Sequence, residues 1–314
     1  MRIYFCSDLH ASRRCWKKFL NSWRFYGADH IIVGGDITGK FVVPIVAGPR
    51  GTWSATYLGV ERRVASPEAL ARLETWIADA GQYSFRTTPD EREWYGEDQS
   101  RIDGLFRRLA VERVVEWVEE AEAKLAGAPV RVFLSAGNDD FFDVDDAIAQ
   151  STLIEDPNER LVELDGGYEI LGMGWGNLTP WRCPRDIPED DLARRIDKIA
   201  ARVRDPRRTI FSLHVPPWGS GLDAAPQLDE RFTPSVGPDG VEMTSVGSTA
   251  TKAAILRYRP LLGLHGHVHE SKGVRELGGV LIANPGSEYS EGILTGVLVD
   301  IDRTGVRNLQ LVSG

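Results

Sequence analysis

The sequence predicts an α/β protein, because short runs of β-favouring residues alternate along the chain with segments of helical periodicity. The run 30–36 is the clearest strand: its apolar residues lead directly into Gly34-Gly35-Asp36, as in a buried parallel strand followed by a turn. The segment 12–26 shows the helical pattern, with large apolar residues three and four apart and Gly27 after its end. A carboxylate directly after such a strand lies where open α/β sheets place their sites. Asp36 is therefore a candidate functional residue; the alternative is an ordinary turn aspartate.

Composition and charge exclude several classes of protein. The chain has 314 residues, of which 42% are hydrophobic and 26% charged, as in a globular protein with a sizeable core. The net charge of -9 argues against a general binder of nucleic-acid phosphates. Three cysteines without a C-x-x-C pair favour reduced thiols. No leader-like or membrane-spanning run is present, so we expect a cytoplasmic protein without membrane attachment.

Two predicted strands in the first half of the chain end in ligand-type side chains. The strand 2–7 runs into Asp8-Leu9-His10. Residues i and i+2 of extended backbone point to the same side, so Asp8 and His10 share a side. The strand 130–135 runs into Gly137-Asn138-Asp139-Asp140, a turn rich in oxygen ligands. These two strand ends join Asp36 as candidate parts of one site.

Two predicted strands in the second half end in imidazoles. The strand 209–213 leads to His214, and the apolar run 261–264 leads to His267 and His269. These last two histidines also stand in an i, i+2 relation and share a side. Two imidazoles aimed at one point favour a metal site. The alternative is a pair of surface histidines in a loop.

From residue 41 to 129 the chain departs from the alternating pattern. We expect this stretch to be a mostly helical insertion in a single domain of residues 1–314. Because it directly follows the strand that carries Asp36, we expect it to shape access to the site. Its predicted parts are a hairpin or loop at 41–57, a helix at 67–80 with Ser66 as N-cap, irregular exposed chain at 81–100, and a helix at 101–125.

The remaining predicted elements complete the α/β pattern. Asp165-Gly166-Gly167 is a hairpin signal between two strands. The Pro- and Gly-rich segment 221–246 is predicted as a loop near the site. The other elements are strands at 161–164, 168–173, 279–283, 292–300 and 306–312, and helices at 188–203 and 249–258.

Taken together, the five strand ends resemble the calcineurin-like metallophosphoesterase family. The segments 247–270 and 284–287 look most like its bacterial and archaeal branch of predicted phosphoesterases related to cyclic-nucleotide phosphodiesterases. The matching signatures follow the family's order over nearly the whole chain: Asp8-x-His10, Gly35-Asp36, Gly137-Asn138, His214 and Gly266-His267-x-His269.

The resemblance implies a four-layer α/β/β/α sandwich with a dinuclear metal centre. A bridging hydroxide at such a centre attacks phosphorus, so the implied enzyme is a hydrolase of phosphodiesters or phosphomonoesters. Oxygen and imidazole ligands suit Mn, Fe, Zn or Ni. The implied substrate is a small-molecule phosphate ester or a nucleotide. One ion would be held by Asp8, His10, Asp36 and His269. The other would be held by Asp36, Asn138, His214 and His267. The implied catalytic residues are Asp36, Asn138, Asp139 and His214.

The chain departs from the family pattern at one position. Many members read Gly-Asn-His at the third signature, and that histidine is thought to protonate the leaving group. Here the position is Asp139. Beside two divalent cations a carboxylate stays ionised and is a poor proton donor. We therefore expect a preference for esters with good leaving groups.

Two other functions remain as alternatives. A catalytically weak protein of this fold would act as a protein-interaction scaffold, with the insertion as docking surface. A nuclease would use the same two-metal chemistry, but the acidic balance and the lack of a basic, aromatic-interleaved patch argue against nucleic acid. The sequence makes no prediction of oligomeric state.

Overall fold

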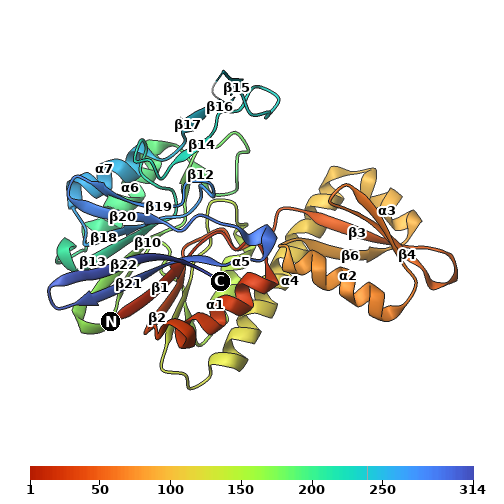
Figure 1. Cartoon of the computed structure of the whole chain (residues 1–314), viewed down its shortest axis with the longest axis horizontal. Coiled ribbons are helices and arrows are strands. Elements are labelled where there is room, and N and C mark those ends of the chain that lie inside the picture. Colours follow the sequence, from red (N-terminus) through yellow and green to blue (C-terminus); the bar gives the residue numbers. More distant parts are fainter. Residues whose placement is uncertain (239) are drawn as a thin grey trace.

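The computed structural model describes residues 1–238 and 240–314. Within this part of the chain, two sheets of six strands stack against each other and helices cover their outer faces (Figure 1). The predicted four-layer α/β/β/α sandwich is confirmed. None of the helices in the described residues is long and apolar enough to cross a membrane.

The first sheet has a parallel centre and an antiparallel edge. Its strand order is β22-β21-β1-β2-β7-β8. The parallel strands are β1 (Arg2–Cys6), β2 (His30–Val33), β7 (Arg131–Leu134) and β8 (Ile154–Glu155), and the antiparallel ones are β21 (Thr295–Asp302) and β22 (Gly305–Ser313).

The second sheet also has a parallel centre, with an antiparallel strand at each edge. Its strand order is β19-β20-β18-β13-β10-β9. The predicted hairpin around Asp165–Gly167 is confirmed, since β9 and β10 pair antiparallel on either side of it. The sequence did not indicate the edge strand β19. The strands are β9 (Leu161–Glu163), β10 (Glu169–Met173), β13 (Thr209–Leu213), β18 (Leu262–Leu264), β19 (Gly273–Leu277) and β20 (Val280–Asn284).

Side-chain alternation in the strands explains why three apolar layers form. In β1, Ile3 and Phe5 face the second sheet, while Tyr4 and Cys6 face the helices on the other side. In β13, Ile210 packs between the sheets, whereas Phe211 and Leu213 pack toward the helices on the other face of the second sheet. Both faces of each sheet are therefore buried, and this accounts for strands that are apolar throughout their length.

Helices α1 (Arg13–Tyr26), α4 (Gln99–Leu125) and α5 (Asp143–Ala149) cover the first sheet. The rings of Trp16 and Trp117 stack at 4.6 Å between α1 and α4. Helices α6 (Glu189–Ala200) and α7 (Thr249–Tyr258) cover the second sheet. The long α4 starts in the predicted insertion, but its second half is part of the sandwich.

The insertion contains a four-stranded sheet, of which the sequence analysis foresaw only the hairpin at 41–57, as one of two alternatives; two antiparallel strands lie there. The prediction of irregular chain at 81–100 is wrong, because β6 and α3 lie there. The edge strand β5 is polar and lacks the apolar alternation that marks a strand in sequence. In Figure 1 this unit projects from one side of the sandwich. Its elements are β3 (Val42–Ala47), β4 (Trp53–Tyr57), β5 (Val60–Val64), α2 (Pro67–Asp79), β6 (Tyr83–Thr87) and α3 (Pro89–Gly96), with strand order β5-β4-β3-β6.

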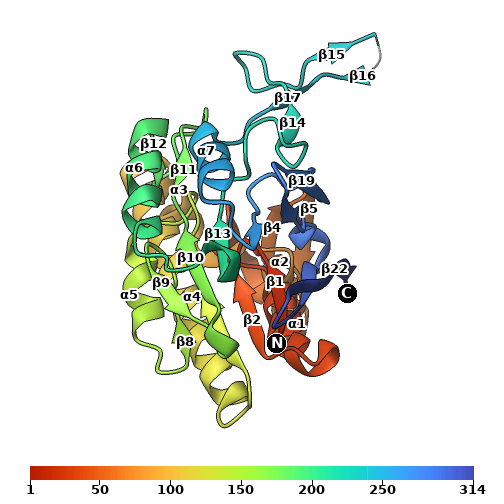
Figure 2. The same cartoon turned by 90° about the vertical axis from the view of Figure 1, so that its left-hand side faces the viewer.

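A second projection is formed by the segment predicted as a loop at 221–246. It extends beyond the sandwich in both views (Figures 1 and 2). It is a thin arm of short paired strands, which the Pro- and Gly-rich sequence did not indicate; residue 239 lies outside the described part. Its strands are β14 (Ala224–Pro226), β15 (Val236–Gly237), β16 (Gly240–Val241) and β17 (Met243–Ser245). Two further short strands, β11 (Gly176–Asn177) and β12 (Asp186–Ile187), pair beside the sandwich.

Candidate metal centre

The polar residues predicted from the sequence follow the carboxyl ends of five strands. β1, β2 and β7 are parallel neighbours in one sheet, and β13 and β18 are parallel neighbours in the other. Because these ends lie at the same edge of the sandwich, residues far apart in sequence meet there. The structure brings together Asp8, His10, Asp36, Asn138, Asp139, His214, His267 and His269.

The first ligand group consists of Asp8, His10 and His269. Their ligand atoms lie within 4.8 Å of one another. The Nε2 atoms of the two imidazoles are 3.1 Å apart, and His269 Nε2 is 3.4 Å from Asp8 Oδ1. Three donor atoms thus converge from β1 and β18, on opposite sheets.

The second ligand group consists of Asp36, His214 and His267, with Asn138 beside it. The three ligand atoms again lie within 4.8 Å of one another. Asp36 Oδ1 is 3.3 Å from His214 Nε2, and Asn138 Oδ1 is 2.9 Å from His267 Nδ1. The amide oxygen therefore points into the same group as the imidazoles.

Asp36 lies between the two groups. Its Oδ1 faces His214, while its Oδ2 is 3.9 Å from His10 Nε2 in the first group. The carboxylate is 3% exposed, so water does not solvate its charge freely. A buried carboxylate with one oxygen toward each group has the geometry of a bridging ligand.

The backbone at these residues is held in the left-handed region. Asp8, His10, Asp36 and His267 have φ values of 58°, 40°, 50° and 66°. Such conformations cost free energy for residues other than glycine, and they persist where the surrounding structure enforces them, commonly at functional sites. The strand ends therefore turn sharply and aim the four side chains inward.

Glycines next to the ligands allow the loops to approach closely. A Cβ on Gly35 would collide with the His214 ring, and one on Gly137 would collide with Asp36. A Cβ on Gly266 would collide with the Asp8 carboxylate. The glycines of the three sequence signatures are thus required by packing around the ligand atoms.

The environment favours the neutral imidazole in His10 and His267 and the ionised carboxylate in Asp8, but it favours the protonated form of His214. Burial lowers the pKa of His10 to about 3 and that of His267 to about 4, which favours the neutral imidazole. Burial opposes ionisation of Asp8, but the hydrogen bond from His269 and the charge on His214 lower its pKa to about 2. In His214, by contrast, the carboxylate of Asp36 outweighs burial and raises the pKa to about 9. The positive charge on His214 thus offsets the negative charge of Asp36. A bound metal ion would offset the charge of Asp36 in place of that proton.

Residues around the ligands fix their orientation. The Nδ1 atoms of His10 and His214 each lie 3.0 Å from a backbone carbonyl, so the Nε2 atoms face the centre. Asn138 donates its Nδ2 to Asp186 Oδ1 at 2.8 Å, which turns the amide oxygen inward. Asp140 is fully buried and accepts hydrogen bonds from the backbone of Ile37, Thr38 and Gly137. The sequence pattern singled out Asp140 but not Asp186, which begins the two-residue strand β12 and belongs to no recognisable motif.

The donor set fits divalent metal ions. The buried Nε2 of His214 has no hydrogen-bond partner among the described residues, although Asp36 is near. Two imidazole nitrogens 3.1 Å apart satisfy each other with at most one proton. Nitrogen and carboxylate ligands together are the ligands of transition-metal sites. A cation in each group would satisfy these atoms.

Asp139 differs from the other predicted residues. Its backbone N–H donates to Asp36 Oδ1 at 3.1 Å, and its carboxylate lies with Asp36 and His10 in a third group of ligand-type atoms. Its own oxygens, however, are occupied by side chains: Cys183 Sγ is 3.3 Å from Oδ1, and Lys40 Nζ is 3.3 Å from Oδ2. The sequence analysis did not identify either Lys40 or Cys183.

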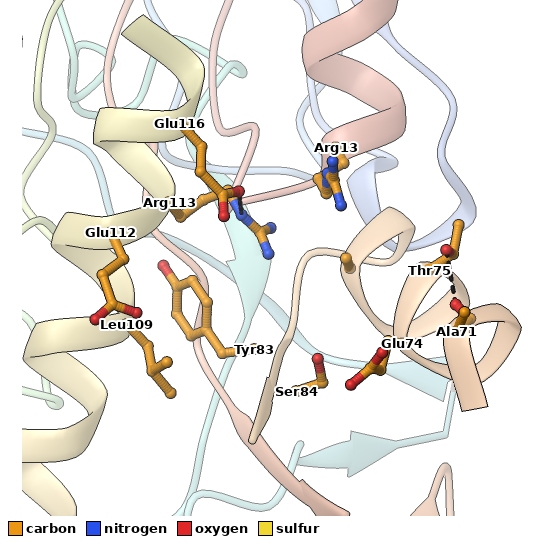
Figure 3. A pocket seen from close by; sticks show the side chains of 11 residues that line it. Arg13, Ala71, Glu74, Thr75, Tyr83, Ser84, Leu109, Glu112, Arg113 and Glu116 are labelled. Atoms are coloured by element: carbon orange, nitrogen blue, oxygen red, sulfur yellow. Dashed lines mark hydrogen bonds and ion pairs between the residues drawn. The ribbon is translucent and has the colours of Figure 1, made fainter. Parts of the chain in front are cut away.

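A separate cavity of about 360 Å³ lies between α4, α2 and β6 (Figure 3). Arg113 and Glu116 form an ion pair at 3.2 Å in its wall, with Tyr83 below them. Arg113 also donates to the carbonyl of Ala11 at 2.7 Å, and Tyr83 accepts from the N–H of Gly39 at 2.7 Å. The cavity is not the metal centre, but its walls contact the loops that carry His10 and Asp36.

Comparison with known proteins shows the fold. No family model matches the chain. An uncharacterized protein of Methanocaldococcus jannaschii, MJ1162, is 22% identical over 158 residues, which cover 50% of this chain and 64% of that protein. The match thus spans less than two thirds of the length of that relative.

Among solved structures, TT1561 of Thermus thermophilus aligns over 99% of this chain and 97% of its own, with a TM-score of 0.55 and 15% identity. The two proteins share a fold. A structure described as that of a novel archaeal phosphodiesterase aligns with a TM-score of 0.40 and 13% identity. That similarity is too weak to bear on function.

Proposed function

We propose that this protein is a metallophosphoesterase that hydrolyses phosphate esters at a centre of two divalent metal ions. The observation that carries the proposal is the position of Asp36, whose two carboxylate oxygens face two separate groups of ligand atoms. A single structural metal needs one closed set of ligands, whereas two sets joined by a carboxylate fit a pair of ions. The proposed ligands are Asp8, His10, Asp36, Asn138, His214, His267 and His269.

Two divalent ions at such a centre polarise a phosphoryl group and lower the pKa of water, which supplies the nucleophile at neutral pH. The residues of the chain then have distinct tasks. Asp36 neutralises part of the charge on both ions. Asp186 holds Asn138 with its oxygen toward the second group. The carbonyls that contact the Nδ1 atoms of His10 and His214 keep both rings in place.

The ligand types narrow the choice of metal. Every proposed ligand offers nitrogen or oxygen, and Cys183, whose thiol contacts Asp139, belongs to none of the three groups. This set suits Mn, Fe, Zn or Ni. The substrate is proposed to be a small-molecule phosphate ester or a nucleotide, because the net charge of -9 disfavours the phosphate backbone of nucleic acids.

The insertion is proposed to shape access to this centre. Ser12, two residues after His10, donates its hydroxyl to the carbonyl of Asp79 at the end of α2, at 2.6 Å. Gly39, three residues after Asp36, donates to Tyr83 of β6. Both contacts join the insertion directly to ligand-bearing loops.

The test is hydrolysis of aryl phosphomonoesters and phosphodiesters by the purified protein after reconstitution with Mn²⁺. Asp36→Ala removes the bridging carboxylate and is expected to abolish turnover, while Asp90→Ala, on the exposed face of α3, serves as control. Metal content is measured in parallel by mass spectrometry. Wild-type protein that binds no metal, or that hydrolyses no ester with Mn, Fe, Ni or Zn, would overturn the proposal and favour a scaffold.

A further inference from the structure

Lys40 lies at the edge of the candidate metal centre, four residues after Asp36. Its ammonium is 3.3 Å from Asp139 Oδ2, and its side chain is 39% exposed. The other oxygen of Asp139 accepts a hydrogen bond from Cys183. Both oxygens of Asp139 thus have side-chain partners, and the contact with Oδ2 holds Lys40 in place.

The charge of Lys40 acts on the ligand groups. Asp139 lies within 4.8 Å of the ligand atoms of Asp36 and His10, so the lysine that contacts it stands next to both. After burial, Lys40 is the largest contribution that lowers the pKa of His10. Burial acts to lower the pKa of Lys40 itself, but Asp139 and Asp36 raise it above its ordinary value. Lys40 is therefore a permanent positive charge at the centre.

The number of donors on Lys40 exceeds what Asp139 uses. An ammonium group carries three N–H donors, and a single contact with Asp139 leaves two for another partner. The partial exposure of the side chain makes these donors accessible to a bound molecule. Because Lys40 also neutralises Asp139, an anion can approach without meeting an unpaired carboxylate.

Phosphate chemistry indicates what that partner is. A phosphomonoester has three terminal oxygens and a charge near −2 at neutral pH, whereas a diester has two terminal oxygens and a charge of −1. If two metal ions held two terminal oxygens, a monoester would have a third terminal oxygen left for a cationic donor at the edge of the centre. A diester would have no third terminal oxygen to offer.

Resting on the function proposed above, we propose that Lys40 binds the third terminal oxygen of the substrate and makes the centre select phosphomonoesters over diesters. Lys40 is then a substrate-binding residue, and Asp139 is the residue that positions it. The position where the family has a histidine is thus occupied here by a carboxylate whose role is to orient a lysine.

The test compares Lys40→Met and Lys40→Arg with Lys17→Met, which removes an exposed lysine of α1 and changes the net charge equally. Binding of inorganic phosphate to the Mn²⁺-loaded proteins is measured by calorimetry at pH 7.5. We expect Lys40→Met to weaken phosphate binding on the order of tenfold or more, because a charge-assisted hydrogen bond is lost. Lys40→Arg should restore part of the affinity, and Lys17→Met should bind as the wild type does.

Kinetics with matched aryl monoesters and diesters give the second readout. We expect Lys40→Met to raise KM for the monoester about tenfold while the values for the diester stay within threefold. Metal stoichiometry and thermal unfolding are checked for each variant. Unchanged phosphate binding, or an equal loss on both substrates, would overturn the role of Lys40. If the wild type hydrolyses neither ester, the proposed function fails, and phosphate binding by Lys40→Met still decides whether Lys40 is an anion-binding residue.

Discussion

The Nε2 atoms of His10 and His269 lie 3.1 Å apart, although 259 residues separate the two histidines in sequence. Two imidazoles in this arrangement share at most one proton between their Nε2 atoms, and a second proton there would set two N–H groups against each other. His10 is completely buried, so solvent does not relieve the conflict. A metal ion bound by both nitrogens does, and the apposition therefore predicts that metal binding stabilises the fold.

Addition of Mn²⁺ to chelator-treated protein should raise Tm by several degrees, since a ligand at 100 times its Kd adds about 2.7 kcal/mol to the free energy of unfolding. His10→Ala should remove most of this shift. His30→Gln is the matched control, because His30 is equally buried but stands at the start of β2, away from the ligand groups. His30→Gln should lower Tm in the absence of metal, yet Mn²⁺ should still raise its Tm. A wild-type Tm that does not respond to Mn, Fe, Zn or Ni would contradict the prediction.

The hydroxyl of Tyr83 links the insertion to the loop after β2, since it accepts from the N–H of Gly39 at 2.7 Å. Tyr83→Phe leaves this buried N–H without its partner, at a cost of about 1–3 kcal/mol in the free energy of unfolding. Because the loop carries Asp36 and Lys40, kcat/KM for a phosphate ester should also fall, on the order of tenfold.

Tyr57→Phe provides the control within the same insertion. The hydroxyl of Tyr57 is buried but has no hydrogen-bond partner among the described residues. Removal of this hydroxyl should change neither the free energy of unfolding, measured by urea denaturation, nor kcat/KM appreciably. Equal effects of the two substitutions would mean that the insertion acts through its general packing and not through the contact with Gly39.

The carboxyl of Asp156 predicts a pH-dependent stability unrelated to metal. Burial raises its pKa to about 6, well above the ordinary value for an aspartate, so the folded protein holds this proton more tightly than the unfolded chain. The resulting stabilisation is complete below about pH 4 and is lost as the pH rises through about 6. A pKa difference of about 2 between the folded and unfolded chain corresponds to at most about 3 kcal/mol.

Asp156→Asn removes this titration. The variant should therefore gain stability relative to the wild type as the pH rises from 4.5 to 7.5, measured by urea denaturation. Asp300→Asn should differ from the wild type by a nearly constant amount over this range, because the hydrogen bond from Arg2 lowers the pKa of Asp300 and the resulting stabilisation is lost only below about pH 4. A pH-independent difference between Asp156→Asn and the wild type would show that the buried carboxyl does not titrate as described.

The carboxylate of Asp139 beside the candidate metal centre predicts how the rate depends on the leaving group. Burial and Asp36 raise the pKa of Asp139, while Lys40 opposes them; two divalent cations would further favour the ionised form. An ionised carboxylate gives no proton to the leaving group. Rates over a series of aryl phosphodiesters should therefore fall steeply as the leaving-group pKa rises.

Asp139→His should flatten this dependence, because an imidazolium is a proton donor near neutral pH. Asp139→Asn should keep the steep slope and much of the rate on esters with good leaving groups. A shallow slope in the wild type, or a large loss with Asp139→Asn on the best leaving groups, would show that Asp139 acts as an acid or as a ligand.

The structure brings together the candidate residues that the sequence predicted because their positions follow from the arrangement of parallel strands in a sheet. The carboxyl ends of parallel strands meet at one edge, so Asp8 and His10 after β1 lie near Asp36 after β2. The rule that side chains two apart share a side does not apply to them, because Asp8 and His10 have positive φ values and are not in extended backbone. The sheet of the insertion was predicted only in part, as a hairpin that was one of two alternatives at 41–57. Its strand β5 is mostly exposed and largely charged, and its hydrophobic pattern is therefore too weak to mark it as a strand.

The sequence by itself determined the α/β pattern and the strand ends, because both depend on local periodicity and on a few glycines. The assignment of the candidate ligands rested on the resemblance of these strand ends to a known family. Only the tertiary structure decided that Asp36 faces both ligand groups, that Asp186 orients Asn138, and that Lys40 is held by Asp139. These relationships join loops from different strands. No local pattern encodes them, since the packing of the two sheets sets the distance and direction between loops.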